Sequence, residues 1–167
     1  DINVIGPAEE QERIKGLTLL VQHGDVVNLA EFSLKIDVIG VPGHTSGHIA
    51  FYSAPVLFCG DTLFSAGCGR LFEGSAAQMW QSLQQLLALP DSTQIYCSHE
   101  YTLANIRFAL TVEPQNHDLI MYQQQCQQLR QAGKPTLPTL LAKEKQVNPF
   151  LRCNDARLQQ LWQKETA

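Results

Sequence analysis

The segment from Val38 to His48 reads Val-Ile-Gly-Val-Pro-Gly-His-Thr-Ser-Gly-His, a strand-like run that ends in a turn of small residues with two histidines. Two later segments share this design: Asp61 follows an apolar run that ends at Cys59, and His99 follows another that ends at Cys97. Turns at strand ends let a rigid sheet direct side chains to one place and leave room for a substrate. Imidazole and carboxylate groups suit zinc, iron or manganese, so the three turns predict a metal site. The alternative for each histidine is a hydrogen-bonded residue of the core.

The first hundred residues predict a mixed sheet with one long helix. Short runs rich in apolar and β-branched residues favour strands at 1–6, 18–21, 26–29, 34–39, 48–52, 56–59 and 94–97, with a hairpin turn at 53–55. Between the last two strands, apolar residues recur at helical spacing from Ala76 to Leu87. Ser75 and Gln78 have the spacing of a capping box at the start of this helix, and Pro90 marks its end.

The pattern changes after residue 100, where strand signals stop. Helical spacing is found around 103–110, 121–129, 137–145 and 155–162. We therefore predict an α/β protein with two parts: a mixed domain over residues 1–99 and a helical domain over residues 100–167.

Composition excludes several classes of function. The 167 residues include 44% hydrophobic and 17% charged residues and carry a formal charge of −4, which gives no basic surface for nucleic acid or for an anionic membrane. No apolar run is long enough to span a bilayer. The five cysteines are widely spaced and odd in number, which argues against a disulfide framework and favours a reducing compartment. We expect a cytoplasmic protein without nucleic-acid or membrane partners.

Five ordered motifs carry a family resemblance that covers residues 1 to about 155. The first two, Pro42–His48 and Cys59–Phe64, resemble the motifs of the metallo-β-lactamase superfamily. The other three narrow the match to glyoxalase II, the hydroxyacylglutathione hydrolase family: Gly67–Gly74, Ser98–Thr102 and Asn148–Arg152. The resemblance implies part of an αββα sandwich followed by a small helical domain.

The resemblance also implies roles for individual residues. His44 would bind a first metal ion, His99 a second, and Asp61 would bridge both. Arg70, with Tyr101 and Phe72, would contact the glutathione moiety, although Arg70 could be a surface residue and Tyr101 could cap the domain junction. His48 falls within the first motif but would fix the loop instead of binding metal.

The activity implied by the family is hydrolysis of the thioester S-D-lactoylglutathione to D-lactate and glutathione. The nucleophile would be a hydroxide held between two divalent metal ions, zinc above all, with iron or manganese as alternatives. The expected partner is this small glutathione thioester, and the intact enzyme is expected to be a monomer.

The sequence also departs from the family in two places. The H-x-H-x-D-H cluster of the superfamily is absent, and so is the basic segment with which relatives end. We therefore expect a piece of a larger enzyme that is inactive, or nearly so, by itself.

Three other functions remain open. The first is another thioesterase of this fold or a persulfide dioxygenase, and the second is a metal-free binding domain without catalysis. The third, a cysteine hydrolase using Cys97 and His99, is disfavoured because Cys59 and Cys97 lie on apolar strands and are expected to be buried structural thiols.

Overall fold

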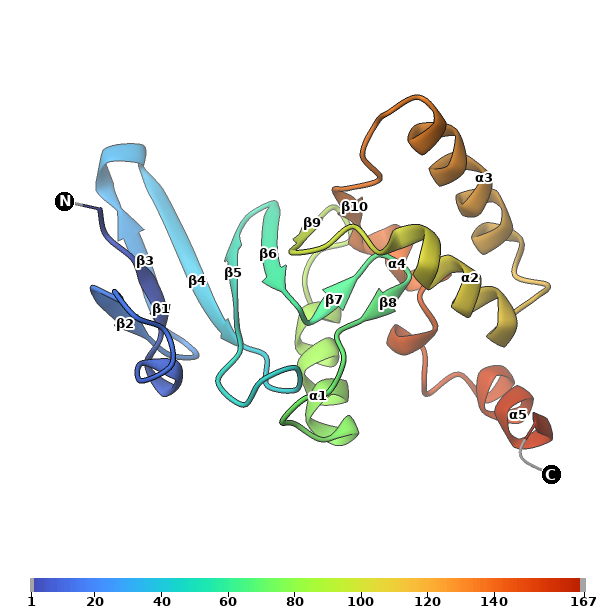
Figure 1. The fold of residues 1–167 in the computed structure, drawn as a ribbon, viewed down its shortest axis with the longest axis horizontal. Helices are drawn as coiled ribbons and strands as arrows, with labels where there is room; N and C mark the ends of the chain where they lie inside the picture. The colour runs from blue at the N-terminus through green and yellow to red at the C-terminus, as the bar shows by residue number, and fades with distance from the viewer. Residues whose placement is uncertain (1, 166–167) are drawn as a thin grey trace.

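The computed structural model describes residues 2–165 of the backbone, and side chains up to residue 161. Figure 1 shows a β-rich end that contains the N-terminus, a central sheet with helix α1 (Ala76–Leu87) packed beside it, and a helical end that contains the C-terminus. The fold is of the α/β class with a helical part at its C-terminal end, as the sequence predicts.

The central sheet has six strands in the order β10-β9-β6-β5-β4-β3. Its strands are β3 (Val26–Leu29), β4 (Leu34–Gly40), β5 (Ile49–Ser53), β6 (Val56–Gly60), β9 (Gln94–Cys97) and β10 (Thr139–Leu140). Neighbouring strands are antiparallel except β6 and β9, which run parallel. The crossover between these two contains α1, as expected of a parallel connection, so both strands end at the same edge of the sheet.

Helix α1 covers one face of this sheet and forms the main core. Its buried side chains Met79, Leu83 and Leu86 pack against Leu57 and Ile95 of the strands. The predicted capping box is present: the Ser75 hydroxyl accepts a hydrogen bond from the Gln78 amide, and the Gln78 side chain accepts one from the Ser75 amide. The capping box therefore fixes the start of α1 at Ala76.

The opposite face of the sheet is covered at one end only. Strands β1 (Ile5–Pro7) and β2 (Leu19–Val21) form a separate parallel pair, and Val21 packs with Val27 and Val38 of the large sheet. Short 3-10 helices follow β1 (η1, Ala8–Glu10) and β3 (η2, Ala30–Phe32). Further along this face, on β6, the Phe58 side chain is 55% exposed.

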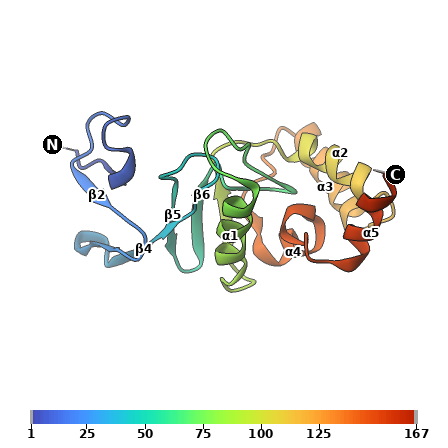
Figure 2. The same cartoon turned by 90° about the horizontal axis from the view of Figure 1, so that it is seen from below.

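The helical end consists of α2 (Thr102–Val112), α3 (His117–Gln131), α4 (Leu141–Val147), η3 (Pro149–Leu151) and α5 (Ala156–Glu165). Figure 2 shows α4 between α1 and the outer helices. A hairpin of β7 (Leu63–Phe64) and β8 (Gly67–Cys68) joins the two ends, because Ala66 at its turn is buried in the cluster formed by α2 and α3.

Two expectations about local structure need correction. The helix predicted over 137–145 begins only at Leu141, because Thr139 and Leu140 pair with β9 as strand β10. The β7–β8 hairpin was not predicted, since its two-residue strands are too short for a period-2 pattern.

Two carboxylates hold the loop between β4 and β5, which contains His44. Glu73 accepts hydrogen bonds from the Ser46 amide at 2.9 Å and from the Ser46 hydroxyl at 2.7 Å. Glu10 accepts one from the Gly47 amide at 3.1 Å, and the Arg13 guanidinium contacts both carboxylates. The hydrogen bonds from Ser46, with a smaller contribution from Arg13, lower the pKa of Glu73 to about 2.

We predict that Leu86→Ala lowers the free energy of unfolding by about 2–5 kcal/mol, because it removes a fully buried side chain from the main core. Urea unfolding followed by circular dichroism measures the change. Gln81→Ala, on the exposed face of the same helix, is the control and is expected to change stability by less than about 0.5 kcal/mol. Equal effects of the two substitutions would contradict this description of the core.

A second prediction concerns acid stability. The pKa of Glu73 is lower in the folded chain than in the unfolded chain, so its contribution is present above the ordinary pKa of about 4.3 and is lost as the pH falls toward 2. Wild-type protein should therefore exceed Glu73→Gln in stability near neutral pH, and the difference should shrink at about pH 3. Urea unfolding of both proteins at the two pH values tests this, and a pH-independent difference would refute it.

Candidate metal site

The three predicted metal ligands follow the ends of strands β4, β6 and β9, of which β6 and β9 are neighbours. His44 follows β4, Asp61 follows β6 directly and His99 follows β9. The parallel register of β6 and β9 pairs Gly60 with Cys97, so the turns that contain Asp61 and His99 begin side by side. Sheet topology thus places His44 and His99, which are 55 positions apart in the sequence, around the Asp61 carboxylate.

Each histidine faces a different oxygen of the Asp61 carboxylate. The Nε2 atom of His44 lies 3.4 Å from Oδ2, and the Nε2 atom of His99 lies 3.5 Å from Oδ1. These distances exceed the 2.7–3.2 Å of a good hydrogen bond. Two donors bound to the same zinc ion at about 2.0–2.2 Å, in tetrahedral geometry, lie roughly 3.4 Å apart. The residues therefore fit a metal ion on each side of Asp61, with the carboxylate between the two.

The orientation of His44 is fixed by the neighbouring loop. Its Nδ1 atom lies 2.8 Å from the carbonyl oxygen of Arg70. A neutral imidazole in this position donates its Nδ1–H to the carbonyl, which leaves the lone pair of Nε2 directed toward Asp61. Metal-binding histidines commonly have such a partner on the second ring nitrogen.

Asp61 is oriented by two groups beyond the three predicted ligands. The Ser98 hydroxyl donates a hydrogen bond to Oδ1, and the backbone amide of Asp61 donates to Nε2 of His48 at 3.0 Å. Burial, together with the nearby His44, lowers the pKa of His48, so its ring stays neutral and can accept this bond. The expected loop-fixing role of His48 thus has a specific contact. Sequence reasoning missed Ser98, for which its place directly before His99 was the available signal.

Two glycines make this arrangement possible. Gly60 adopts a φ of 53°, and a Cβ there would lie 2.5 Å from the ring of His48. At Gly69 a Cβ would lie 1.7 Å from the carbonyl oxygen of Asp61. A side chain at either position would displace the loops that hold the carboxylate.

The three residues predicted to contact the substrate flank the histidines. The Phe72 ring lies 4.9 Å from the His44 ring, and the Arg70 guanidinium lies 5.4 Å from the centre of the Phe72 ring. On the other side, Tyr101 stacks on His99 with ring centres 5.0 Å apart. Arg70, Phe72 and Tyr101 are all exposed, so the structure leaves them available for contact.

The described part of the chain supplies an incomplete ligand set. Among the side chains that the structure describes, up to residue 161, no three His, Cys, Asp or Glu surround a single point where a metal ion could bind. This agrees with the geometry above, in which each side of Asp61 has two donors only. Structural zinc takes four ligands and catalytic zinc three protein ligands, so each side lacks at least one.

The cysteines do not form a nucleophilic site. Burial raises the pKa of the Cys59 thiol to about 12 and also raises that of Cys97. Cys97 Sγ donates to the backbone carbonyl of His99 and makes no recorded hydrogen bond to its ring. Thiols that remain protonated near neutral pH are poor nucleophiles, which argues against the cysteine hydrolase.

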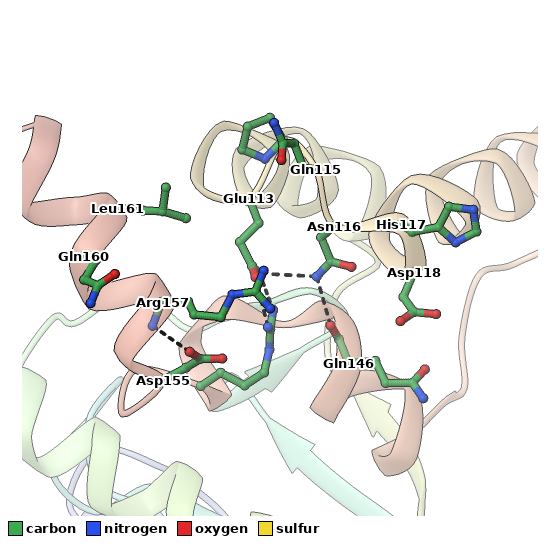
Figure 3. A pocket seen from close by; sticks show the side chains of 12 residues that line it. Glu113, Gln115, Asn116, His117, Asp118, Gln146, Asp155, Arg157, Gln160 and Leu161 are labelled. Atoms are coloured by element: carbon green, nitrogen blue, oxygen red, sulfur yellow. Dashed lines mark hydrogen bonds and ion pairs between the residues drawn. The ribbon is translucent and has the colours of Figure 1, made fainter.

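A large pocket lies elsewhere, at the helical end. It has a volume of about 600 Å³ and lies between the start of α3 and helix α5 (Figure 3). Among its lining residues Arg152 pairs with Glu113, while Asn116 bonds to the Gln146 carbonyl. None of the predicted metal or substrate residues lines this pocket.

Among residues 2–165, no helix has the length and apolar character needed to cross a membrane.

Two family models match consecutive parts of the chain. Residues 5–99 match the model of the metallo-beta-lactamase superfamily. Residues 100–167 match the model described as hydroxyacylglutathione hydrolase C-terminus.

Individual relatives agree with these family matches. The chain is 55% identical over 159 residues to a hydroxyacylglutathione hydrolase of Hamiltonella defensa, a match that covers 95% of this chain and 62% of the relative. It is 56% identical over 160 residues to the enzyme of that name from Aliivibrio salmonicida, covering 96% of this chain and 62% of the relative. The chain thus spans less than two thirds of the length of these relatives.

A solved structure has a similar fold. ETHE1 from Myxococcus xanthus superimposes with a TM-score of 0.61 at 28% identity, over 88% of this chain and 50% of that protein. The fold, the ordered motifs and the family matches lead to the same assignment. The chain belongs to the metallo-beta-lactamase superfamily, and its C-terminal part is similar to the C-terminus of hydroxyacylglutathione hydrolases.

Proposed function

We propose that this chain carries one part of the active site of a thioester hydrolase that converts S-D-lactoylglutathione to D-lactate and glutathione. The observation that supports this most directly is the Asp61 carboxylate with one histidine nitrogen opposite each oxygen, at 3.4 and 3.5 Å. The names of relatives at 55% and 56% identity support the substrate class.

His44 and His99 would each hold one divalent metal ion, and Asp61 would hold both. The metal pair would supply a hydroxide nucleophile near neutral pH and an electrophile for the thioester carbonyl. Zinc, iron and manganese all suit two imidazoles and a carboxylate. The Arg70 carbonyl keeps the His44 lone pair on Nε2, and the Ser98 hydroxyl keeps Oδ1 of Asp61 turned toward His99.

The exposed residues beside the histidines would bind the substrate. The Arg70 guanidinium can hold a carboxylate of the glutathione moiety with two parallel hydrogen bonds. Phe72 and Tyr101, on opposite sides of Asp61, would orient the thioester between them. Hydrolysis breaks the carbon–sulfur bond and releases glutathione as a thiolate, which leaves without help from a general acid.

We predict that His44→Ala and His99→Ala each weaken zinc binding by this chain at least about tenfold, because each removes one of two donors on its side of Asp61. Titration calorimetry of metal-free protein with zinc measures the affinity. His117→Ala, an exposed histidine at the helical end, is the matched control and should bind as wild type does. If all three variants bind zinc equally well, these residues are not the ligands.

The activity requires a chain with a complete ligand set. We therefore predict that a chimera in which the H-x-H-x-D-H segment of a relative precedes Asp1 hydrolyses S-D-lactoylglutathione, and that Asp61→Asn lowers its kcat at least about a hundredfold. The reaction is monitored by the decrease in absorbance of the thioester.

The same chimera distinguishes the competing functions. Hydrolysis of other thioesters with no turnover of S-D-lactoylglutathione would contradict the proposed substrate. Consumption of oxygen with glutathione persulfide would identify a persulfide dioxygenase instead. A folded, metal-loaded chimera without any of these activities would favour a binding domain.

A further inference from the structure

The β7–β8 hairpin connects Asp61 to the loop that orients His44. Beyond β8, the Gly69 amide donates a hydrogen bond to the Thr62 carbonyl at 3.1 Å, and Gly69 is packed directly against the backbone of Asp61. The next residue, Arg70, supplies the carbonyl that accepts the Nδ1–H of His44. Movement of the hairpin would therefore change both the Asp61 turn and the partner of His44.

Side chains from the helical end bind the backbone of this hairpin at four consecutive residues. The four contacts are Asn148 Nδ2 to the Phe64 carbonyl at 3.1 Å, Asn105 Nδ2 to the Ser65 carbonyl at 3.0 Å, the Ala66 amide to Glu144 at 2.7 Å, and Asn148 Nδ2 to the Gly67 carbonyl at 2.9 Å. The Ser65 hydroxyl also bonds to Glu144 and to Tyr122. Glu144 and Asn148 are themselves fully buried.

The turn of the hairpin has a backbone conformation that needs such support. Ala66 adopts a φ of 55°, in the left-handed region that is sterically unfavourable for a residue with a Cβ. Conformations of this kind persist only where the surrounding structure fixes them. The Glu144 carboxylate fixes this one through the Ala66 amide.

We propose that Asn105, Glu144 and Asn148 are positioning residues for the candidate metal site, acting through the β7–β8 hairpin on Asp61 and His44. The helical domain then supports the metal site through three residues that act on the hairpin backbone. The consequence for catalysis rests on the proposed function, whereas the effect on His44 can be measured without metal or substrate.

The test reads the tautomer of His44 in metal-free protein. In the wild-type chain, long-range proton–nitrogen NMR spectra at a pH where histidine is neutral should show His44 with its proton on Nδ1. We expect Asn105→Ala, and Glu144→Gln more strongly, to shift part of the His44 signal to the Nε2–H form. Asn105 is only partly buried and gives one hydrogen bond to the hairpin, so its variant tests the proposal even if the Glu144 variant does not fold.

Asn116→Ala is the matched control. This asparagine caps α3 and bonds to the Gln146 carbonyl, so its loss should lower the melting temperature while the contacts to the hairpin remain. Its His44 signal should stay as in wild type. An unchanged His44 in folded Asn105→Ala and Glu144→Gln would overturn the proposal, and so would an equal shift in Asn116→Ala.

A second measurement, the zinc affinity of the variants, distinguishes failure of this inference from failure of the proposed function. Zinc affinity of Asn105→Ala should fall about tenfold, in line with loss of support around a ligand. A shift of the His44 tautomer with unchanged zinc affinity would overturn the link from positioning to metal binding. Lack of thioester hydrolysis by the chimera would instead refute the proposed function and leave the His44 result standing.

Discussion

The parallel pairing of β6 with β9 is the constraint on which the candidate site depends. It aligns Gly60 with Cys97, so the two strands end at the same edge of the sheet. Asp61 and His99 follow within two residues, and β4 delivers His44 to that edge through the loop held by Glu73 and Glu10. A crossover helix is needed to make two strands parallel, and the capped helix α1 provides it.

The elements with strong local signals could be predicted from the sequence. The strands around the three turns have continuous apolar or β-branched runs, and α1 has both a capping box and an apolar face. The β7–β8 hairpin and β10 could not be predicted, because each consists of two-residue strands whose conformation depends on tertiary contacts. The same holds for Ala66, whose left-handed backbone follows from Glu144, a residue 78 positions away.

Sequence reasoning chose the residues of the candidate site by their motifs, but not their mutual geometry. That each histidine would face its own oxygen of Asp61 follows from the direction of three loops, which no local pattern reveals. Ser98 was missed although it directly precedes His99, and the Arg70 carbonyl was missed because a backbone oxygen has no signature in a sequence. The supporting residues Asn105, Glu144 and Asn148 belong to the helical end and lie far in the sequence from the hairpin that they bind.

We propose that Asp61 holds a metal ion on each of its two oxygens, with His44 on one side and His99 on the other. Anomalous diffraction from crystals of this chain grown with zinc tests this arrangement. We expect zinc within about 2.0–2.2 Å of His44 Nε2 and Asp61 Oδ2, or of His99 Nε2 and Asp61 Oδ1. Zinc bound only at other residues, with Asp61 free of metal, would contradict it.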